Sequence, residues 1–190
     1  MLFDQNGTRK YLTPTERKAF IKAAENAEPE VSTFCLTLAY TGARISEALA
    51  LVPARVDMAA QAIIIECLKK RKRGVYRSIP VPATLLCKLN KVHGLSEIDS
   101  SERLWPWGRT KAWLTVKAVM CDAGIPPGLS KPKALRHAFG VAGVTEASVP
   151  LNMMQKWLGH ARIETTAIYA NAMGAEERAI AARMWRRSRV

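Results

Sequence analysis

The sequence has few residues of the kinds that build a metal site or a disulfide framework. Its four cysteines, Cys35, Cys67, Cys87 and Cys121, lie far apart without a CxxC pair, and the chain has three histidines. Zinc sites and disulfide scaffolds need closely spaced ligands or partners. We therefore expect buried thiols of the kind found in a reducing cytosol, and no metal site.

Long apolar runs are also missing. Lys, Arg, Asp or Glu interrupts every candidate run, so no segment reaches the ~18 apolar residues of a membrane span. The first ten residues contain no apolar signal-peptide core. From these absences we expect a cytoplasmic protein with no membrane partner.

Acidic residues are scarce relative to basic ones. The chain has 29 Lys and Arg against 16 Asp and Glu, a net charge of +13, and an isoelectric point near 10.0. Such a field attracts a polyanion, so DNA or RNA is the natural partner. The alternative is a basic surface that only aids solubility. At 190 residues the chain can form one domain with a substantial core.

Helix and turn signals predict a mainly α protein with a small antiparallel β-sheet. Thr13, Pro14 and Glu16 supply an N-cap, a first-turn proline and a capping-box glutamate, so a helix begins near Thr13. The Ile-rich segment 62–68 and the segment 77–81 predict two strands joined by a basic tip. Further helices are expected at 29–41, 45–52, 83–92, 110–123, 132–146, 151–158, 164–171 and 175–187.

Three short motifs stand in a fixed order along the chain. They are TGARISE at 41–47, KALRH at 133–137, and LGH at 158–160 followed nine residues later by Tyr169. In this order they resemble the tyrosine recombinases, or phage integrase family, which have an arginine after a TG turn, an HxxR box, and an LGH box with a tyrosine beyond it. The resemblance extends from about residue 12 to residue 172.

The resemblance implies a domain layout. Residues 12–174 are expected to adopt the tyrosine recombinase catalytic-domain fold, after a short lead-in of residues 1–11. Residues 175–190 would form a C-terminal amphipathic helix with a basic tail, which either caps this domain's own core or packs on a neighbouring protomer. Most family members carry an N-terminal DNA-binding clamp domain, whereas about eleven residues precede the first helix of this chain.

The resemblance also assigns roles to the motif residues. Tyr169 would be the nucleophile that attacks a DNA phosphate, and Arg44, Lys133, Arg136 and His160 would supply positive charge and hydrogen bonds. Without the family pattern, Tyr169 would be interpreted as an interface tyrosine and His160 as a core histidine.

Individual positions leave alternatives that the residues themselves do not decide. Arg44 can grip a phosphate at two points or pair with Glu47 one turn later. Lys133 and Arg136 share a helical face, so both can reach one anion. Lys133 stands where the family usually has histidine, and a lysine cannot exchange a proton near neutral pH unless its pKa is strongly lowered. His137 points about 100° away from Arg136, so we interpret it as structural.

The remaining family position is a lysine on the hairpin, which the resemblance implies protonates the leaving DNA 5′ oxygen. A short hairpin would select Lys72, whereas the longer loop seen here favours Lys69, and we choose Lys69. The other basic residues of the tip are expected to bind the DNA backbone: Lys70, Arg71, Lys72 and Arg73.

The resemblance thus implies a site-specific DNA recombinase that cleaves and rejoins DNA through a 3′-phosphotyrosine at Tyr169, with no metal, ATP or other cofactor. Its partners would be double-stranded DNA, further copies in a tetramer on DNA, and accessory DNA-bending proteins. The alternative is a catalytically silent DNA-binding remnant that lacks its clamp domain. A type IB topoisomerase is a weaker third hypothesis.

Overall fold

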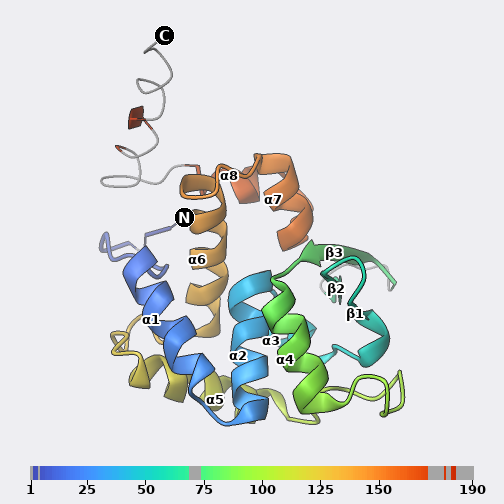
Figure 1. Cartoon of the computed structure of the whole chain (residues 1–190). Coiled ribbons are helices and arrows are strands. Elements are labelled where there is room, and N and C mark those ends of the chain that lie inside the picture. The colour runs from blue at the N-terminus through green and yellow to red at the C-terminus, as the bar shows by residue number, and fades with distance from the viewer. Residues whose placement is uncertain (1, 4, 69–73, 171–177, 179–180, 183–190) are drawn as a thin grey trace.

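The computed structural model describes residues 2–3, 5–68, 74–170, 178 and 181–182 of the chain (Figure 1). The predicted tip residues 69–73 and most of the predicted C-terminal helix 175–187 lie outside these described residues. The elements in chain order are α1 (Pro14–Glu25), α2 (Pro29–Thr41), α3 (Ile45–Leu49), the 3-10 helix η1 (Pro53–Arg55), β1 (Val56–Asp57), β2 (Ala62–Glu66), β3 (Tyr76–Pro80), α4 (Ala83–His93), α5 (Arg109–Asp122), α6 (Pro132–Thr145), α7 (Leu151–Leu158) and α8 (Glu164–Ala167).

Helix α2 forms the centre of the fold and contacts α1, α4, α5 and α6 (Figure 1). Its residues from Ser32 to Ala39 are all buried, which explains why this helix is apolar over most of its circumference. The helix ends at Gly42, whose backbone has a φ of 59° in the left-handed region, as glycine permits. The mainly helical fold predicted from the sequence is confirmed.

The small sheet is antiparallel with strand order β1-β2-β3, and it contacts α3 through β2 and α7 through β3. Strands β2 and β3 pair so that Ile63 lies opposite Ile79, and both side chains are fully buried. The predicted hairpin is therefore confirmed. Strand β1, which pairs Val56 with Ile63, was not predicted because two residues carry no detectable alternation.

A second and smaller hydrophobic cluster adjoins the main core, and Phe139 and Trp157 pack against both. It joins Leu2 and Tyr11 of the N-terminal segment to Val141 of α6, Met154 and Leu158 of α7, and Tyr169. The N-terminal segment is fixed by an antiparallel bridge between Phe3 and Arg9. The residues predicted as a short lead-in therefore pack beneath the segment that carries Tyr169.

Two predicted helices are shorter than expected. Helix α3 ends at Leu49 rather than residue 52, because Pro53 disfavours a helical conformation at the residue before it. Helix α8 ends at Ala167 rather than residue 171, and Tyr169 lies in the turn after it. There the Tyr169 N–H donates to the Thr166 carbonyl at 3.0 Å, an i→i−3 bond that tightens the turn.

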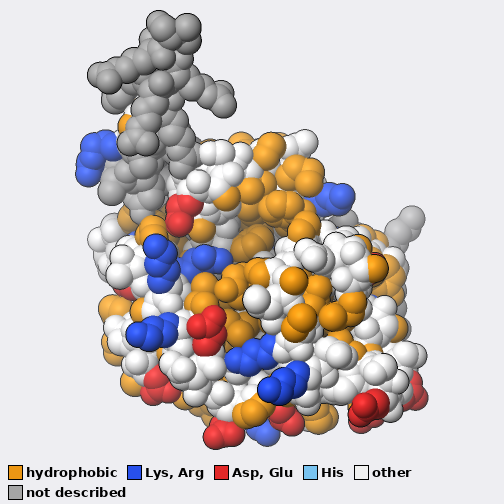
Figure 2. All heavy atoms as spheres, viewed as in Figure 1, with side chains coloured by type: hydrophobic (Ala, Val, Ile, Leu, Met, Phe, Trp, Pro, Cys, Tyr) orange, Lys and Arg blue, Asp and Glu red, His pale blue; other side chains and the backbone are white. Residues whose placement is uncertain are grey.

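The visible surface in Figure 2 has hydrophobic side chains gathered over its centre and upper part, and Lys and Arg side chains lie mostly toward its left and lower parts. Among the residues that the structure describes, no helix is long and apolar enough to cross a membrane.

Candidate active site

One open cleft of about 850 Å³ brings together five residues that the sequence motifs single out. They come from the α2–α3 junction, from α6, and from the turns that follow α7 and α8. The charged and titratable side chains that line the cleft are Arg44, Glu47, Arg109, Lys131, Lys133, Arg136, His137, His160 and Tyr169. Five of these are basic and one is acidic, so the cleft is suited to an anion.

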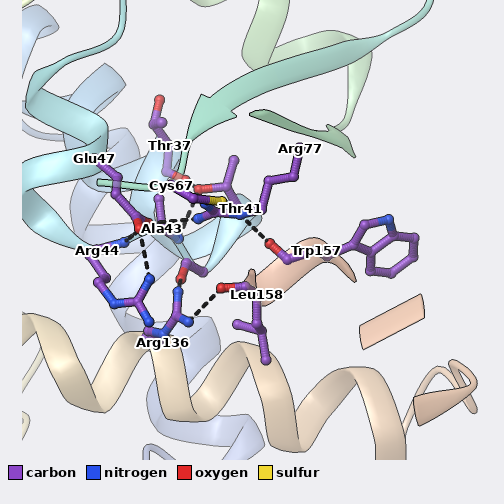
Figure 3. Close-up of polar contacts among 11 residues, drawn as sticks. Thr37, Thr41, Ala43, Arg44, Glu47, Cys67, Arg77, Arg136, Trp157 and Leu158 are labelled. Carbon is purple, nitrogen blue, oxygen red and sulfur yellow. Dashed lines mark hydrogen bonds and ion pairs between the residues drawn. The ribbon is translucent and has the colours of Figure 1, made fainter. Parts of the chain in front are cut away.

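Arg136 crosses from α6 to the C-terminal ends of two other helices (Figure 3). Its guanidinium donates hydrogen bonds to the Gly42 carbonyl at 2.7 Å and to the Leu158 carbonyl at 2.6 Å. These carbonyls end α2 and α7, where unpaired C=O groups carry partial negative charge. The bonds use two of five guanidinium N–H groups, so Arg136 is held in place with donors left for an anion in the cleft.

A buried chain of charges fixes Arg44 (Figure 3). The Glu47 carboxylate accepts hydrogen bonds from the backbone N–H of Arg44 at 3.0 Å and from its guanidinium at 2.7 Å. Glu47 Oε2, which accepts from the Arg44 backbone N–H, also accepts a bond from Arg77 at 2.6 Å, and the Glu47 and Arg77 side chains are almost fully buried. Arg44 thus pairs with Glu47, which confirms that alternative, and it also lines the cleft. Its grip on a phosphate stays a prediction.

Arg77 was not singled out from the sequence. It lies on β3, where its guanidinium also donates to the Trp157 carbonyl at 2.7 Å and contacts the Cys67 sulfur at 3.1 Å. The available signal was an arginine at an inward-facing position of the strand, two residues before the fully buried Ile79.

The pKa values follow from burial and from this dense positive charge. Burial and, to a lesser extent, the nearby charge of Arg44 lower the pKa of Arg136 to about 10, so the side chain is still charged near neutral pH. Burial raises the pKa of Glu47, but Arg77 and Arg44 outweigh that effect and hold the pKa below its ordinary value. At neutral pH the cleft therefore presents fixed positive charge.

His160 and Tyr169 converge because helix α7 ends at Leu158 and the chain changes direction at the next residue. Gly159 has a φ of 64°, which favours glycine, and it lets His160 leave the helix axis. The His160 Nδ1 lies 2.9 Å from the Thr166 hydroxyl, and its ring stacks on Tyr169 with centroids 6.3 Å apart. Burial and the neighbouring arginines lower the pKa of His160 to about 4. The imidazole is therefore neutral near neutral pH.

Tyr169 is held in a close-fitting seat on α6. The side chain is 1% exposed, and a methyl group at Gly140 would lie 2.6 Å from its ring, so the glycine leaves the space that the ring fills. Its hydroxyl lies 3.2 Å from the Nδ1 of His137. Burial raises the pKa of Tyr169 despite the opposing effect of Arg136 and Arg44, so the phenol carries its proton at neutral pH.

One sequence interpretation changes at this point. His137 was expected to point away from the site, but it lines the same cleft and contacts the phenol, so a purely structural role does not follow from its position. Lys133 is exposed at the cleft and shares it with Arg136 as predicted. The hairpin residues Lys69, Lys70, Arg71, Lys72 and Arg73 lie outside the described residues.

No group of three or more His, Cys, Asp or Glu side chains able to hold a metal ion is found in the part of the chain that the structure describes. Chemically, the cleft places a neutral phenol beside two fixed guanidinium groups. Such a site can bind a phosphate-like anion and present an oxygen nucleophile to it.

Comparison with known proteins identifies relatives of the chain. The family model described as the phage integrase family matches residues 10–176. Tyrosine recombinase XerD of Mycobacterium tuberculosis (strain ATCC 25618 / H37Rv) is 31% identical over 141 residues, covering 68% of this chain and 43% of the relative. The type 1 fimbriae regulatory protein FimB of Escherichia coli (strain K12) is 27% identical over 172 residues, covering 86% of this chain and 85% of FimB.

Among solved structures, the crystal structure of XerA recombinase superposes with a TM-score of 0.76 at 23% identity, covering 95% of this chain and 65% of that one. This likeness establishes the fold predicted from the motifs. The chain spans less than half the length of the XerD relatives that it matches.

Proposed function

Since the chain belongs to the phage integrase family, we propose that it is a site-specific DNA recombinase that cleaves and rejoins DNA through a 3′-phosphotyrosine at Tyr169. One observation carries the proposal. A single basic cleft contains a buried phenol together with two guanidinium groups that separate elements hold in place. This is the arrangement needed to attack a phosphodiester.

The arginines address the first barrier to phosphodiester cleavage, which is the negative charge that builds on the phosphoryl oxygens in the transition state. Arg44 and Arg136 would grip these oxygens, and Lys133 would add positive charge at the edge of the cleft. Because hydrogen bonds hold Arg44 and Arg136 in place before DNA binds, these two side chains need little reorganisation during the reaction.

The second barrier is the leaving 5′ oxygen, which needs a proton. We propose that a hairpin lysine donates it, with Lys69 chosen and Lys72 as the alternative. The neighbouring residues Lys70, Arg71 and Arg73, with the lysine that is not the acid, would bind the DNA backbone without reading sequence. His160, neutral in the free protein, would donate a hydrogen bond to the phosphate. The bond energy retained in the phosphotyrosine allows rejoining without ATP.

The proposed partner is double-stranded DNA. The proposed assembly is a tetramer on that DNA, with accessory DNA-bending proteins as further partners and the C-terminal residues 175–190 as a segment for docking on a neighbouring protomer. Support for DNA comes from the excess of basic residues in the cleft and in the whole chain.

The test is covalent capture on DNA. The purified chain is incubated in EDTA with negatively supercoiled plasmid that carries DNA from around its own gene, and protein–DNA adducts are detected after denaturation. Wild-type protein is expected to relax the plasmid and form an adduct, and Tyr169→Phe is expected to do neither. Tyr76→Phe is the matched control, because Tyr76 is 49% exposed and lies outside the cleft lining, so it should form the adduct normally.

Other outcomes separate the alternatives. DNA binding without any adduct would favour the silent DNA-binding remnant, and addition of an N-terminal clamp domain would then distinguish a truncated enzyme from a decayed one. An adduct that persists in Tyr169→Phe would contradict the assignment of the nucleophile.

A further inference from the structure

His137 has a contact that the proposed mechanism does not yet use. It follows Arg136 on α6, is 9% exposed, and places its Nδ1 3.2 Å from the hydroxyl oxygen of Tyr169. The two rings lie 5.9 Å apart at 57°. Among the described residues, His137 is the one hydrogen-bond partner of this hydroxyl. The histidine therefore touches the atom that would become the nucleophile.

Hydrogen-bond accounting indicates which of the two groups donates. The Nε2 of His137 is buried and has no partner among the described residues. If the Nδ1–H donated to Tyr169, both Nε2 and the phenolic O–H would be left unpaired. If the phenol donates to Nδ1, only the Nε2–H is left. The second arrangement leaves fewer unpaired groups, so Tyr169 donates and His137 accepts.

We propose, on the premise of the function above, that His137 is the base that accepts the phenolic proton when Tyr169 attacks the DNA phosphate. The Tyr169 oxygen forms a bond to phosphorus as the bond from phosphorus to the 5′ oxygen breaks. The phenolic proton passes to Nδ1 of His137, and the departing 5′ oxygen takes a proton from the hairpin lysine. In rejoining, the 5′ hydroxyl returns its proton to the hairpin lysine as its oxygen displaces the tyrosine oxygen, which recovers its proton from His137.

Other groups in the cleft are less suited to this task. Lys133 and the arginines are protonated, so they cannot accept a proton without first losing one. The Nδ1 of His160 is occupied by the Thr166 hydroxyl, and its ring stacks on the face of Tyr169 instead of meeting the phenolic oxygen. His137 alone among the described residues combines a neutral nitrogen with contact to that oxygen.

Because of the charges around His137, its pKa is expected to depend on whether DNA occupies the cleft. Burial, followed by the charges of Lys133 and Arg136 of α6 and of Lys10 in the N-terminal segment, lowers the pKa of His137 to about 4. A phosphodiester in the cleft would place negative charge among these cations and raise the pKa. The imidazole would then hold a proton more readily when substrate is present than when the cleft is empty.

The first experiment needs no DNA. The chain has three histidines, His93, His137 and His160, so nitrogen NMR signals can be assigned by substitution to Asn. We expect His137 as the Nε2–H tautomer, unprotonated from pH 5.5 to 8, with an Nδ1 signal that shifts in Tyr169→Phe. An Nδ1–H tautomer, or no response to Tyr169→Phe, would overturn the proposal, because the imidazole would then not be the acceptor.

The second experiment measures cleavage of a half-site DNA against pH. His137→Asn keeps an acceptor near the Nδ1 position but cannot take the proton, and His137→Leu removes the acceptor. Both variants are expected to cleave about 10²-fold or more slowly than wild type. The wild-type rate should fall at acid pH as His137 becomes charged, and this acid limb should be missing in His137→Asn.

The outcomes separate this inference from the proposed function. If wild type forms the adduct and His137→Asn forms it at the same rate with the same pH dependence, the base assignment is wrong and the recombinase proposal stands. If wild type forms no adduct even after an N-terminal clamp domain is added, the recombinase proposal is overturned, and the base assignment that rests on it is overturned as well. A variant that melts at a lower temperature is compared by its pH profile, which a purely structural loss would not change.

Discussion

The two sides of the cleft are built in different ways. The arginine side, comprising Arg44, Glu47, Arg77 and Arg136, is held by charged hydrogen bonds of 2.6–3.0 Å to carboxylate and carbonyl oxygens. The nucleophile side, comprising His137, His160 and Tyr169, consists of neutral rings held by stacking, by the seat at Gly140 and by hydrogen bonds of 2.9 and 3.2 Å.

The cores behind the two sides differ as well. The backbone of the arginine side continues into the large cluster around α2, whereas Tyr169 belongs to the small cluster that includes Leu2 and Tyr11. We infer that the positive field is fixed in advance, as transition-state stabilisation requires, and that the phenol can be displaced at lower cost. The two sides meet at the end of α7, whose Trp157 and Leu158 carbonyls are held by Arg77 and Arg136.

The largest expected effect comes from breaking the arginine side at Glu47. Glu47→Ala would leave Arg77, with 3% side-chain exposure, as an unpaired buried charge. Removing one partner of a buried ion pair costs about 3–5 kcal/mol of folding free energy. Urea unfolding monitored by circular dichroism should show this loss.

The double variant Glu47→Leu with Arg77→Met provides the control, because it removes both charges. It should recover most of the stability yet still cleave DNA poorly, since Arg44 loses its carboxylate partner. Full stability in the single variant Glu47→Ala would show that water already reaches Arg77, and the contrast between the two sides would disappear.

The next effect is on chemistry as well as on folding, because Arg136 also donates to the Gly42 and Leu158 carbonyls. Arg136→Ala removes a fixed donor at the phosphate, so the cleavage rate should fall about 10²–10³-fold, as when an oxyanion donor is lost. Arg109→Ala is the control, because Arg109 also lines the cleft but is exposed. It should weaken DNA binding and leave the rate at saturating DNA close to wild type. Equal rate losses would mean that Arg136 contributes only general positive charge.

The fold and half of the site follow from the sequence for identifiable reasons. Residues that begin or end a helix, such as Thr13, Pro14 and Gly42, act on neighbouring residues in the sequence, so most helix boundaries could be predicted. Arg44, Arg136, His160 and Tyr169 stand at fixed positions in short motifs, and the structure places all four in one cleft.

The remainder depends on contacts between distant segments, which local patterns do not encode. Arg77 contacts Trp157, which lies eighty residues later in the sequence, and His137 contacts Tyr169, which lies thirty-two residues later. The offset of about 100° between neighbouring helical residues suggested that His137 lies away from Arg136, but both residues line the cleft. The packing of Leu2 and Tyr11 against the nucleophile segment is equally non-local.

A smaller effect is expected from displacing the nucleophile. Gly140→Ala would force the Tyr169 ring to shift, because the added carbon lies 2.6 Å from it. Overpacking of this kind costs about 1–3 kcal/mol, partly offset by about 1 kcal/mol of improved helix propensity. The cleavage rate should fall more than the stability.

Gly143→Ala is the matched control on the same helix, because it gains the same propensity and meets the flexible end of Met154 instead of the nucleophile. It should cleave DNA like wild type. Equal loss of cleavage in the two variants would indicate that α6 as a whole, not the seat of Tyr169, sets the rate.

The smallest expected effect is on the pH dependence of folding stability, to which the two sides of the cleft contribute in different pH ranges. The folded pKa values of His137 and His160, about 4, lie below the ordinary value of 6.5, so the unfolded chain binds more protons between these values. Stability should therefore fall as the pH drops from about 6.5 to about 4. Glu47 has a folded pKa below its ordinary 4.5, so its contribution is present above that value and is lost as the pH falls through the folded pKa.

Urea unfolding at a series of pH values from 7.5 to 3 can resolve these windows. His137→Asn should reduce the loss between pH 6.5 and 4 and leave the more acid loss intact, whereas Glu47→Gln should reduce only the more acid loss. The loss of stability between pH 6.5 and 4 should remain small, because His160 is half-buried and water can stabilise its charged form. If His137→Asn instead changed only the more acid loss, the neutral nucleophile side and the charged arginine side would have to be described as one coupled network.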